Sequence, residues 1–327
     1  MKQVMGKIFF FLTAAALFIS VIQGTAAAGG GASYPNGAEG FLNGAIPPPG
    51  FYYLNYSYYY SADTMKDNNG DDVPAFDDIS ILANVSRFIW MTEKNLLGGN
   101  YGQHLFIPYL NVNLDFNGPV GPQSRRNYSD SDLPFLIYSP LVLAYHLQEG
   151  KLHIALSAVD LYIPTGQEDG NLAGVGRNFW TFEPVVALTY MFNDKWAVSG
   201  KFMYDFNTKQ KDYPTNYGFE VDRTPGQEFH VDYSLSYALK KGLRIGLNGY
   251  YYTQTTDDDY DLDSTIPAQV RSMLKEDEGE HSRVFAAGPG IRYNYKNMFF
   301  SLRSQFEMAA KNKTEGDNIW FKFTYAF

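Results

Sequence analysis

Charged side chains alternate with large apolar ones along several segments of this chain. In residues 195–209, for example, Lys201 and Asp205 alternate with Phe202 and Phe206. Period-two alternation places the two sets on opposite faces of a strand, so we expect the charges to face a common interior. The side chains predicted to line this interior as a pore carry both signs: Glu183, Lys201, Asp205, Asp232, Arg244, Arg292, Arg303, Glu307 and Lys322.

Two interpretations of these charges are open. Opposed charges on an inner wall create a field across a pore and exclude neither sign, which would make a constriction that orients a polar or weakly amphipathic solute. The same side chains could instead form an ion-pair lattice that fills a narrow barrel. The two interpretations are compatible with each other.

Catalysis and metal binding are not indicated by the remaining polar residues. A phospholipase in a barrel wall needs a serine and a histidine together on the outer face, and no Gly-flanked serine accompanies a predicted outward histidine. His230 is predicted to face inward beside Asp232. The sequence has no His-x-x-x-His spacing and no cysteine. We therefore predict no catalytic residue, no metal site and no cofactor.

Two acidic runs, residues 67–72 and 257–263, fall in predicted loops. Neither has the twelve-position calcium-loop pattern with its terminal Glu. They are most simply solvated surface, with loose cation bridging to lipopolysaccharide as a further possibility.

Strands must position all of these side chains. Alternating segments of ~10 residues recur between turn residues, and the clearest is 227–240. About twelve such segments can be counted, which predicts an all-β, transmembrane antiparallel β-barrel. Their spans are 50–61, 78–90, 103–116, 134–147, 152–164, 178–192, 195–209, 227–240, 243–256, 282–295, 298–310 and 318–327.

The connections between segments alternate in length. Tight turns alternate with longer loops rich in Gly, Asp and Asn, as in outer-membrane barrels. Only the turn near 92–102 is longer than expected. The apolar register switches near Arg87 and near Asp160, which indicates β-bulges or errors in the assigned spans. A soluble β-sandwich would explain the strands but not the asymmetry of the loops.

The last predicted strand carries aromatics at every second position: Phe321, Phe323, Tyr325 and Phe327. An aromatic face on a terminal strand is expected to meet outer-membrane lipid. Such an ending is also the kind that the barrel-assembly machinery reads. In the first strand, Tyr52, Leu54, Tyr56, Tyr58 and Tyr60 share one face, which we assign to lipid, with Tyr53 and Tyr59 inward. These tyrosines could form a stacking path for aromatic solutes or an interfacial girdle with packing.

Residues 1–28 have the pattern of a secretory signal peptide. Lys2 and Lys7 precede an apolar run, and Ala26 and Ala28 suit cleavage after Ala28. The predicted location is the bacterial outer membrane, with residues 50–327 as the barrel.

Residues 29–49, between the signal peptide and the barrel, are rich in Gly and Pro and are not a strand. They could be a periplasmic linker or a plug that folds into the lumen. The predicted plug residues are Tyr34, Pro35, Asn36, Glu39, Pro47, Pro48 and Pro49.

Composition agrees with a membrane barrel. Aromatic residues make up 17% of the chain, and no second apolar run is long enough to cross a membrane as a helix. The net charge of −9 argues against a nucleic-acid partner.

Several motifs together resemble the outer-membrane proteins associated with the meta-cleavage pathway of phenol degradation. The resemblance covers residues 34–327, and it implies a barrel that moves hydrophobic or aromatic compounds into the cell. The motifs are Tyr34-Pro35-Asn36-Gly37-Ala38-Glu39, Pro47-Pro48-Pro49-Gly50, Leu161-Tyr162-Ile163-Pro164-Thr165-Gly166, Asn178-Phe179-Trp180-Thr181-Phe182-Glu183-Pro184 and Gly288-Pro289-Gly290.

We therefore predict a porin-like channel for passive uptake of small hydrophobic or aromatic compounds. The expected partners are outer-membrane lipid and lipopolysaccharide, the assembly machinery and the solute, with no nucleic acid. The alternatives are a phospholipase-like enzyme of the barrel wall and a structural or adhesive barrel that acts through its loops.

Overall fold

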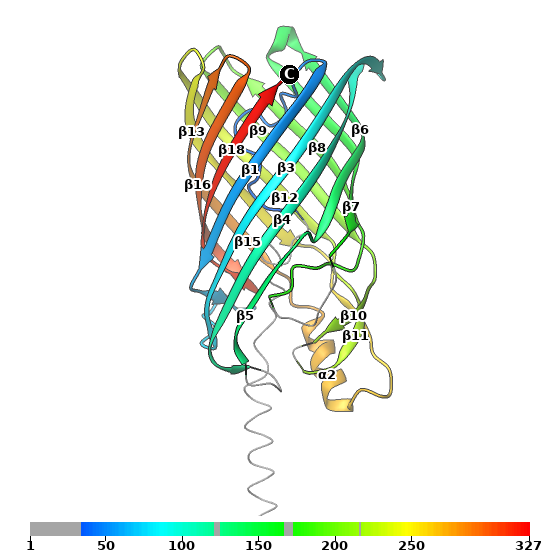
Figure 1. Cartoon of the computed structure of the whole chain (residues 1–327). Coiled ribbons are helices and arrows are strands. Elements are labelled where there is room, and N and C mark those ends of the chain that lie inside the picture. The colour runs from blue at the N-terminus through cyan, green and yellow to red at the C-terminus, as the bar shows by residue number, and fades with distance from the viewer. Residues whose placement is uncertain (1–33, 121–124, 167–172, 216) are drawn as a thin grey trace, which may run out of the picture.

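The computed structural model describes residues 34–120, 125–166, 173–215 and 217–327, and its strands close into an antiparallel barrel (Figure 1). In these residues each barrel strand pairs with its neighbour in the chain, and β1 pairs with β18 to complete the wall. The predicted transmembrane barrel of twelve strands is confirmed. The strands are β1 (Gly50–Ala62), β3 (Phe76–Leu96), β4 (Gly99–Val120), β6 (Phe135–Leu147), β7 (Leu152–Pro164), β8 (Thr181–Met191), β9 (Trp196–Asn207), β12 (Glu228–Lys240), β13 (Leu243–Gln254), β15 (Arg283–Tyr295), β16 (Met298–Lys311) and β18 (Asp317–Ala326).

Smaller elements gather at the end of the barrel opposite the C-terminus, where the longer loops lie (Figure 1). At the other end tight turns join the strands, and one of them holds the 3-10 helix η1 (Gln148–Gly150). Within the described residues, the helices are too short to cross a membrane. The smaller elements are β2 (Met65–Lys66), β5 (Arg125–Asp132), β10 (Gln210–Pro214), β11 (Glu220–Thr224), β14 (Asp259–Asp261), β17 (Lys313–Thr314) and α2 (Ala268–Asp277).

The predicted turn near 92–102 was wrong, and of the two β-bulges considered from the sequence one is present. The long turn near 92–102 is a continuation of β3 and β4, joined by Leu97 and Gly98 in the left-handed region. No bulge occurs at Arg87, which pairs with Leu54 and Phe106 in unbroken register. A register shift does occur in the β7–β8 pairing between Ser157 and Asp160, as expected for a β-bulge.

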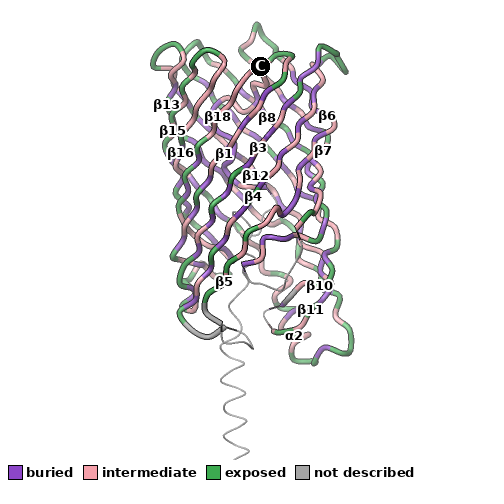
Figure 2. The backbone as a smooth tube through the Cα atoms, viewed as in Figure 1, coloured by how far each residue is buried: buried purple, intermediate pink, exposed green. Residues whose placement is uncertain are grey.

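The strands on one side of the barrel have polar inner faces and apolar outer faces. In β12, His230, Asp232 and Ser234 are buried, whereas Leu235 and Leu239 are exposed. This alternation of buried and exposed residues follows the strands in Figure 2. We call the inner faces of β9, β12 and β16 the polar wall; its buried polar side chains are Ser199, Lys201, Asp205, Glu228, His230, Asp232, Ser234, Ser236, Arg303, Gln305 and Glu307.

The opposite side of the barrel is apolar inside, which corrects the lipid-facing assignment of the first strand. Tyr52, Leu54, Tyr56, Tyr58 and Tyr60 are all buried in the interior. Tyr53 and Tyr59 are the more exposed residues and face outward. The assignment failed because it assumed that the aromatic face of a strand meets lipid.

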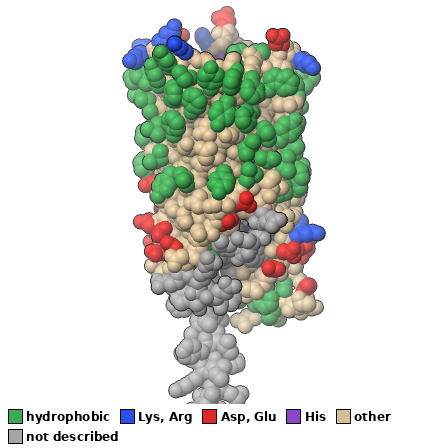
Figure 3. Space-filling view, in the orientation of Figure 1, with side chains coloured by type: hydrophobic (Ala, Val, Ile, Leu, Met, Phe, Trp, Pro, Cys, Tyr) green, Lys and Arg blue, Asp and Glu red, His purple; other side chains and the backbone are tan. Residues whose placement is uncertain are grey.

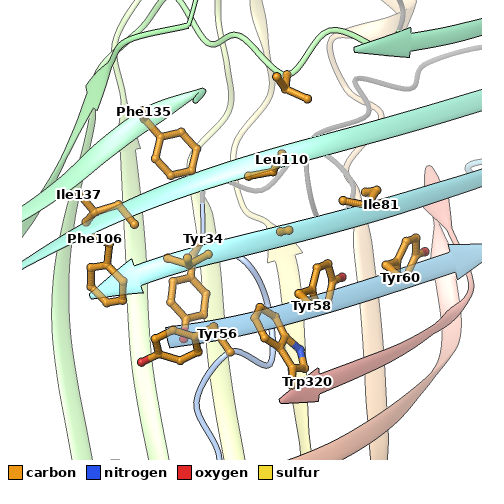
Figure 4. Close-up of a cluster of buried hydrophobic side chains, with 14 of the residues drawn as sticks. Tyr34, Tyr56, Tyr58, Tyr60, Ile81, Phe106, Leu110, Phe135, Ile137 and Trp320 are labelled. Atoms are coloured by element: carbon orange, nitrogen blue, oxygen red, sulfur yellow. The ribbon is translucent and has the colours of Figure 1, made fainter. Parts of the chain in front are cut away.

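We call the inner faces of β1, β3 and β4 the apolar wall. Tyr58 packs against Trp320 of β18 with ring centroids 4.1 Å apart, and Figure 4 shows this group of rings and aliphatic side chains turned toward one another. The buried apolar side chains of this wall include Tyr52, Leu54, Tyr56, Tyr58, Tyr60, Ile79, Ile81, Ala83, Val85, Ile89, Phe106, Leu110, Val112 and Leu114.

The outer face of β1 and β3 carries short polar side chains. The amide of Asn55 donates to Asn84 Oδ1 at 3.0 Å, and Asn84 donates back to Asn55 Oδ1 at 3.2 Å. Tyr53 and Ser86 share a hydrogen bond of 3.1 Å beside them. In Figure 3, a tan area interrupts the green hydrophobic belt over these strands. Polarity is therefore inverted across this part of the wall.

Candidate functional site

Residues 34–49, the N-terminal segment, enter the barrel interior and bind Asp232 of β12. This carboxylate accepts hydrogen bonds from the Tyr34 hydroxyl at 2.8 Å, from Gly37 N at 2.8 Å and from Glu39 N at 2.9 Å. Asp232 is fully buried, so these three donors replace the water that its charge would otherwise require.

A tight turn shapes the segment where it meets Asp232. Ala38 N donates to Pro35 O at 3.1 Å, and Gly37 adopts a φ of 79°. Glycine at the third position of such a turn is typical of type II geometry. A Cβ on Gly37 would also lie 2.2 Å from Gln305 Oε1, so both conformation and space require glycine here.

The side chain of Glu39 reaches toward the apolar wall. Its Oε1 atom accepts hydrogen bonds from Arg87 at 2.8 Å and from the Tyr56 hydroxyl at 2.9 Å, and its Oε2 atom accepts from Lys322 Nζ at 2.7 Å. These partners come from the adjacent strands β3, β1 and β18, whereas β12 lies almost opposite β1 in the strand order. Glu39 thus joins two facing sides of the lumen, with its backbone on one and its side chain on the other.

Further backbone groups of the segment bind the wall. Leu42 N donates to Ser199 Oγ at 3.2 Å, and Gly44 N donates to Thr189 Oγ1 at 3.0 Å. The carbonyl oxygens accept from the wall in turn: Ala38 from Arg303 at 2.7 Å, Gly40 from Ser234 at 3.2 Å and Phe41 from Arg292 at 3.2 Å.

The predicted plug residues divide between interior and exterior. Tyr34, Asn36 and Glu39 are buried and Pro35 is half-buried, whereas Pro48 and Pro49 are exposed and lead into β1. Pro47 is half-buried. Pro48 O accepts a hydrogen bond from the Tyr52 hydroxyl at 2.8 Å. That the segment obstructs the lumen stays a prediction.

All nine charges predicted to line a pore are buried or half-buried inside the barrel, and their partners differ. Asp232, Arg292, Arg303 and Lys322 bind the N-terminal segment as described, and Lys201 Nζ lies 4.1 Å from the Tyr34 ring centroid. The remaining four bind other parts of the wall. Glu183 accepts from Tyr162, Glu307 from Tyr60 and Tyr250, Arg244 donates to Ser236 and Lys195 O, and Asp205 lies beside His230.

Two cavities adjoin Glu39. One, of about 40 Å³, is almost entirely apolar and lies between the N-terminal segment and the apolar wall, where Tyr58, Phe106 and Trp320 line it. The other, of about 360 Å³, has mixed polarity and is lined by Pro47, Arg292 and other residues toward the tight-turn end. Because Glu39 borders both, its contacts with Arg87, Tyr56 and Lys322 separate the two spaces.

A buried group of Ser139, His104 and Asp160 was not anticipated from the sequence. Ser139 contacts both His104 Nε2 and Asp160 Oδ1, and Arg87 lies 2.9 Å from His104 Nδ1. Arginine can only donate, so Nδ1 accepts and the ring proton lies on Nε2. Nε2 therefore cannot take a proton from Ser139, and this is not the geometry of a catalytic triad.

The two acidic runs have protein partners. Asp67 Oδ1 accepts from Asn69 N and Asp71 N, and Asp257 pairs with His281 at 2.7 Å. Calcium binding or bridging to lipopolysaccharide by these runs stays a prediction.

Comparison with known proteins places the chain in a family. The family model described as "Putative MetA-pathway of phenol degradation" matches residues 62–323. No curated protein sequence matches the chain significantly.

Comparison with solved structures finds several outer-membrane proteins. An outer-membrane channel from Pseudomonas putida F1 is 14% identical, with a TM-score of 0.64 over 86% of this chain and 97% of that one. A mutant of TodX, a monoaromatic hydrocarbon channel, is 10% identical with a TM-score of 0.48 over 94% and 98% of the two chains. The Ralstonia pickettii toluene transporter TbuX is 12% identical with a TM-score of 0.46 over 94% and 99%.

All three are described as channels or transporters. At 14% identity, the likeness to the Pseudomonas channel shows the barrel fold alone. The family model covers most of the sequence, and its match includes ten of the twelve barrel strands in full, together with the last residue of β1 and most of β18. The chain therefore belongs to the family described as "Putative MetA-pathway of phenol degradation".

Proposed function

We propose that this protein is a passive outer-membrane channel for small hydrophobic compounds, aromatic ones included. The observation that carries the proposal is the apolar cavity between the N-terminal segment and the apolar wall. A continuous inner face of Tyr, Phe, Ile and Leu is poorly hydrated, so it would not assist the passage of ions or sugars, which stay hydrated. Membership of the family and the names of the aromatic-hydrocarbon channels with similar barrels support the same solute class.

In this proposal the N-terminal segment acts as a plug. A solute enters the apolar cavity and passes to the larger cavity only when the Glu39 side chain moves away from Arg87 and Lys322. Those contacts are reversible, so passage needs no energy source other than the concentration gradient. Consumption of the compound inside the cell would maintain that gradient.

Placement in the cell belongs to the same proposal. Cleavage after Ala28 would release the mature chain to the periplasm, and the aromatic terminal strand would engage the assembly machinery. The loop-rich end would then face outward, against lipopolysaccharide, and the tight turns would face the periplasm.

Uptake of a labelled aromatic compound by intact cells tests the solute class. Ala83 lines the apolar cavity and Leu82 beside it is 57% exposed on the outer face. Ala83→Phe should fill the cavity and lower uptake about tenfold or more, a loss of ~1.4 kcal/mol in passage, whereas Leu82→Phe, the matched control, should leave uptake unchanged. Equal uptake in both variants would reject the apolar path.

Conductance in planar bilayers tests the plug. Deletion of residues 29–49 should raise single-channel conductance, and Glu39→Gln, which keeps the shape but removes the charge, should increase the frequency of opening. A deletion that leaves both conductance and solute permeation unchanged would reject the plug while leaving the solute class to the uptake experiment.

A further inference from the structure

A cluster of three side chains in the polar wall is separate from the contacts of Glu39. Asp205 of β9 and Glu228 of β12 are directly paired across the two strands, and His230 follows Glu228 on the same inner face. His230 Nε2 lies 3.3 Å from Asp205 Oδ2 and 3.5 Å from Glu228 Oε2. One ligand atom from each residue lies within 4.8 Å of the others.

The atoms that face the centre of this cluster have no aligned hydrogen bond from any described residue. They are both carboxylate oxygens of Asp205, Glu228 Oε2 and His230 Nε2. Asp205 and His230 are fully buried, so water does not serve these atoms from bulk solvent. Asp232, two residues beyond His230, shows the contrast, because three donors saturate its carboxylate. Buried carboxylates without donors are costly unless a cation binds them.

The atoms of His230 and Glu228 that point away from the centre of the cluster are held by hydrogen bonds to other residues of the interior. His230 Nδ1 donates to Asn36 Oδ1 at 2.7 Å, which leaves the lone pair of the ring on Nε2. The Tyr252 hydroxyl donates to Glu228 Oε1 at 3.0 Å, which leaves Oε2 directed inward. Such supporting bonds are what orient histidine and carboxylate ligands in metal sites.

A proton on His230 would satisfy the cluster less well than a divalent cation. The single Nε2–H group could donate to one carboxylate oxygen, whereas three oxygens lack a donor. Two carboxylates outnumber one imidazolium, and Glu183 adds another buried carboxylate on the adjacent strand β8, while Arg177 and Lys313 bring positive charge near Glu228. A divalent cation would bind a nitrogen and two oxygens at once and neutralise two charges.

The two separations from His230 Nε2 agree with a tetrahedral metal. Ligand atoms bound at ~2.0–2.1 Å in tetrahedral geometry lie about 3.3–3.4 Å apart, close to the 3.3 and 3.5 Å observed from Nε2. Mixed imidazole and carboxylate ligands favour zinc over calcium or magnesium. We propose that Asp205, Glu228 and His230 form a Zn²⁺ site in the barrel interior, with a fourth position for water or Glu183.

The site would also fix the N-terminal segment. Asn36 belongs to that segment and bonds the ring that would bind zinc. Metal binding should therefore hold residues near Asn36 against the polar wall. The motif Glu228-x-His230 is the only trace of this site in the sequence, and it differs from the His-x-x-x-His spacing that the sequence lacks.

Zinc binding by the full mature chain in detergent tests the proposal. The exposed pair His146 and His153, with Nδ1 atoms 2.7 Å apart, could bind zinc independently, so both are changed to Gln in every sample. After EDTA treatment and incubation with Zn²⁺ in excess Mg²⁺, we expect one zinc per chain by atomic emission. His230→Gln and Asp205→Asn should each abolish it.

Two further variants separate binding from folding. His104→Gln, the matched control, changes another buried histidine and should retain full zinc binding. Asn36→Ala should weaken zinc binding by about 10- to 100-fold, because it removes the partner of Nδ1. Heat-modifiable gel mobility reports whether each variant forms the barrel.

Cobalt substitution in the unaltered site gives a measurement that needs no variant of the ligands. Bound Co²⁺ should show the intense visible absorption of tetrahedral coordination. The proposal is overturned if the parent chain retains no zinc, if His230→Gln retains as much as the parent, or if Co²⁺ shows only the weak spectrum of the hydrated ion.

Discussion

The apolar wall and the polar wall belong to one barrel but reverse the relation between inside and outside. On the polar wall, β12 buries His230 and Asp232 and exposes Leu235. On the apolar wall, β1 buries Tyr56 and Tyr58, and its outer face carries Asn55. This difference shows that alternation of polar and apolar residues identifies the two faces of a strand but not which face lies inside the barrel. The side to which the apolar face turns depends on what fills the lumen.

The N-terminal segment, which fills the lumen, also contacts the two walls differently. The N-terminal segment meets the polar wall through backbone groups, which need hydrogen-bond partners, and leaves an apolar cavity against the other wall. Two walls of different chemistry around one segment let it be bound firmly on one side and leave room for an apolar solute on the other.

Removing the largest buried ring should destabilise the barrel most. Trp320 is 1% exposed and packs against Tyr58, so Trp320→Ala should lower the free energy of unfolding by about 3–5 kcal/mol. Ser234→Ala on the polar wall removes one hydrogen bond, to Gly40 O, and should cost only about 1 kcal/mol. Urea unfolding in vesicles, followed by far-UV circular dichroism, measures both. Equal losses would mean that the apolar wall is not packed as described.

A charge on the outer face should be tolerated unequally by the two regions. Leu235 is 43% exposed on the apolar outer face of β12, and Leu235→Arg should cost about 2–4 kcal/mol if hydrocarbon covers it. Asn84→Arg, on the polar outer face of β3, should cost less because Asn55 and Ser86 can solvate it. Unfolding in vesicles of fixed thickness compares them, and the reverse order of losses would contradict the inversion.

The smallest effect is expected from the paired outer amides. Asn55→Leu combined with Asn84→Leu removes both partners of a mutual hydrogen bond. Because neither partner is left unsatisfied, the free energy of unfolding should change by less than about 1 kcal/mol. Each single variant leaves one amide unpaired and should therefore be less stable than the double variant. A double variant that is worse than either single variant would show that these amides have another role.

The sequence was sufficient for the architecture of this protein. Alternation located β7 at residues 152–164, the same bounds that the structure has. It failed for the faces of β1, because the rule that lipid meets the aromatic side holds only where the lumen is wet. The turn near 92–102 was misplaced because Thr92 and Lys94 are polar yet continue a strand beyond the apolar belt.

The contacts of the site could not be derived from local pattern. Tyr34 and Asp232 are 198 residues apart, and nothing near either residue identifies the other. The Tyr34-Pro35-Asn36-Gly37 motif did indicate a turn, and the structure explains its Gly by the φ of 79° and the close approach of Gln305. Predicting the contacts of Glu39 would have required the relative positions of three strands, which are defined only in the closed barrel.

The span of Glu39 between facing sides of the lumen has a consequence for the order of assembly. Its side chain binds Lys322, which is 283 residues away in the chain, and its backbone binds Asp232. The two anchors reach their final separation only when the first and last strands pair, so we expect the segment to dock after the barrel closes. Until that moment water must solvate the carboxylates of the interior, and we expect docking of the segment to displace it.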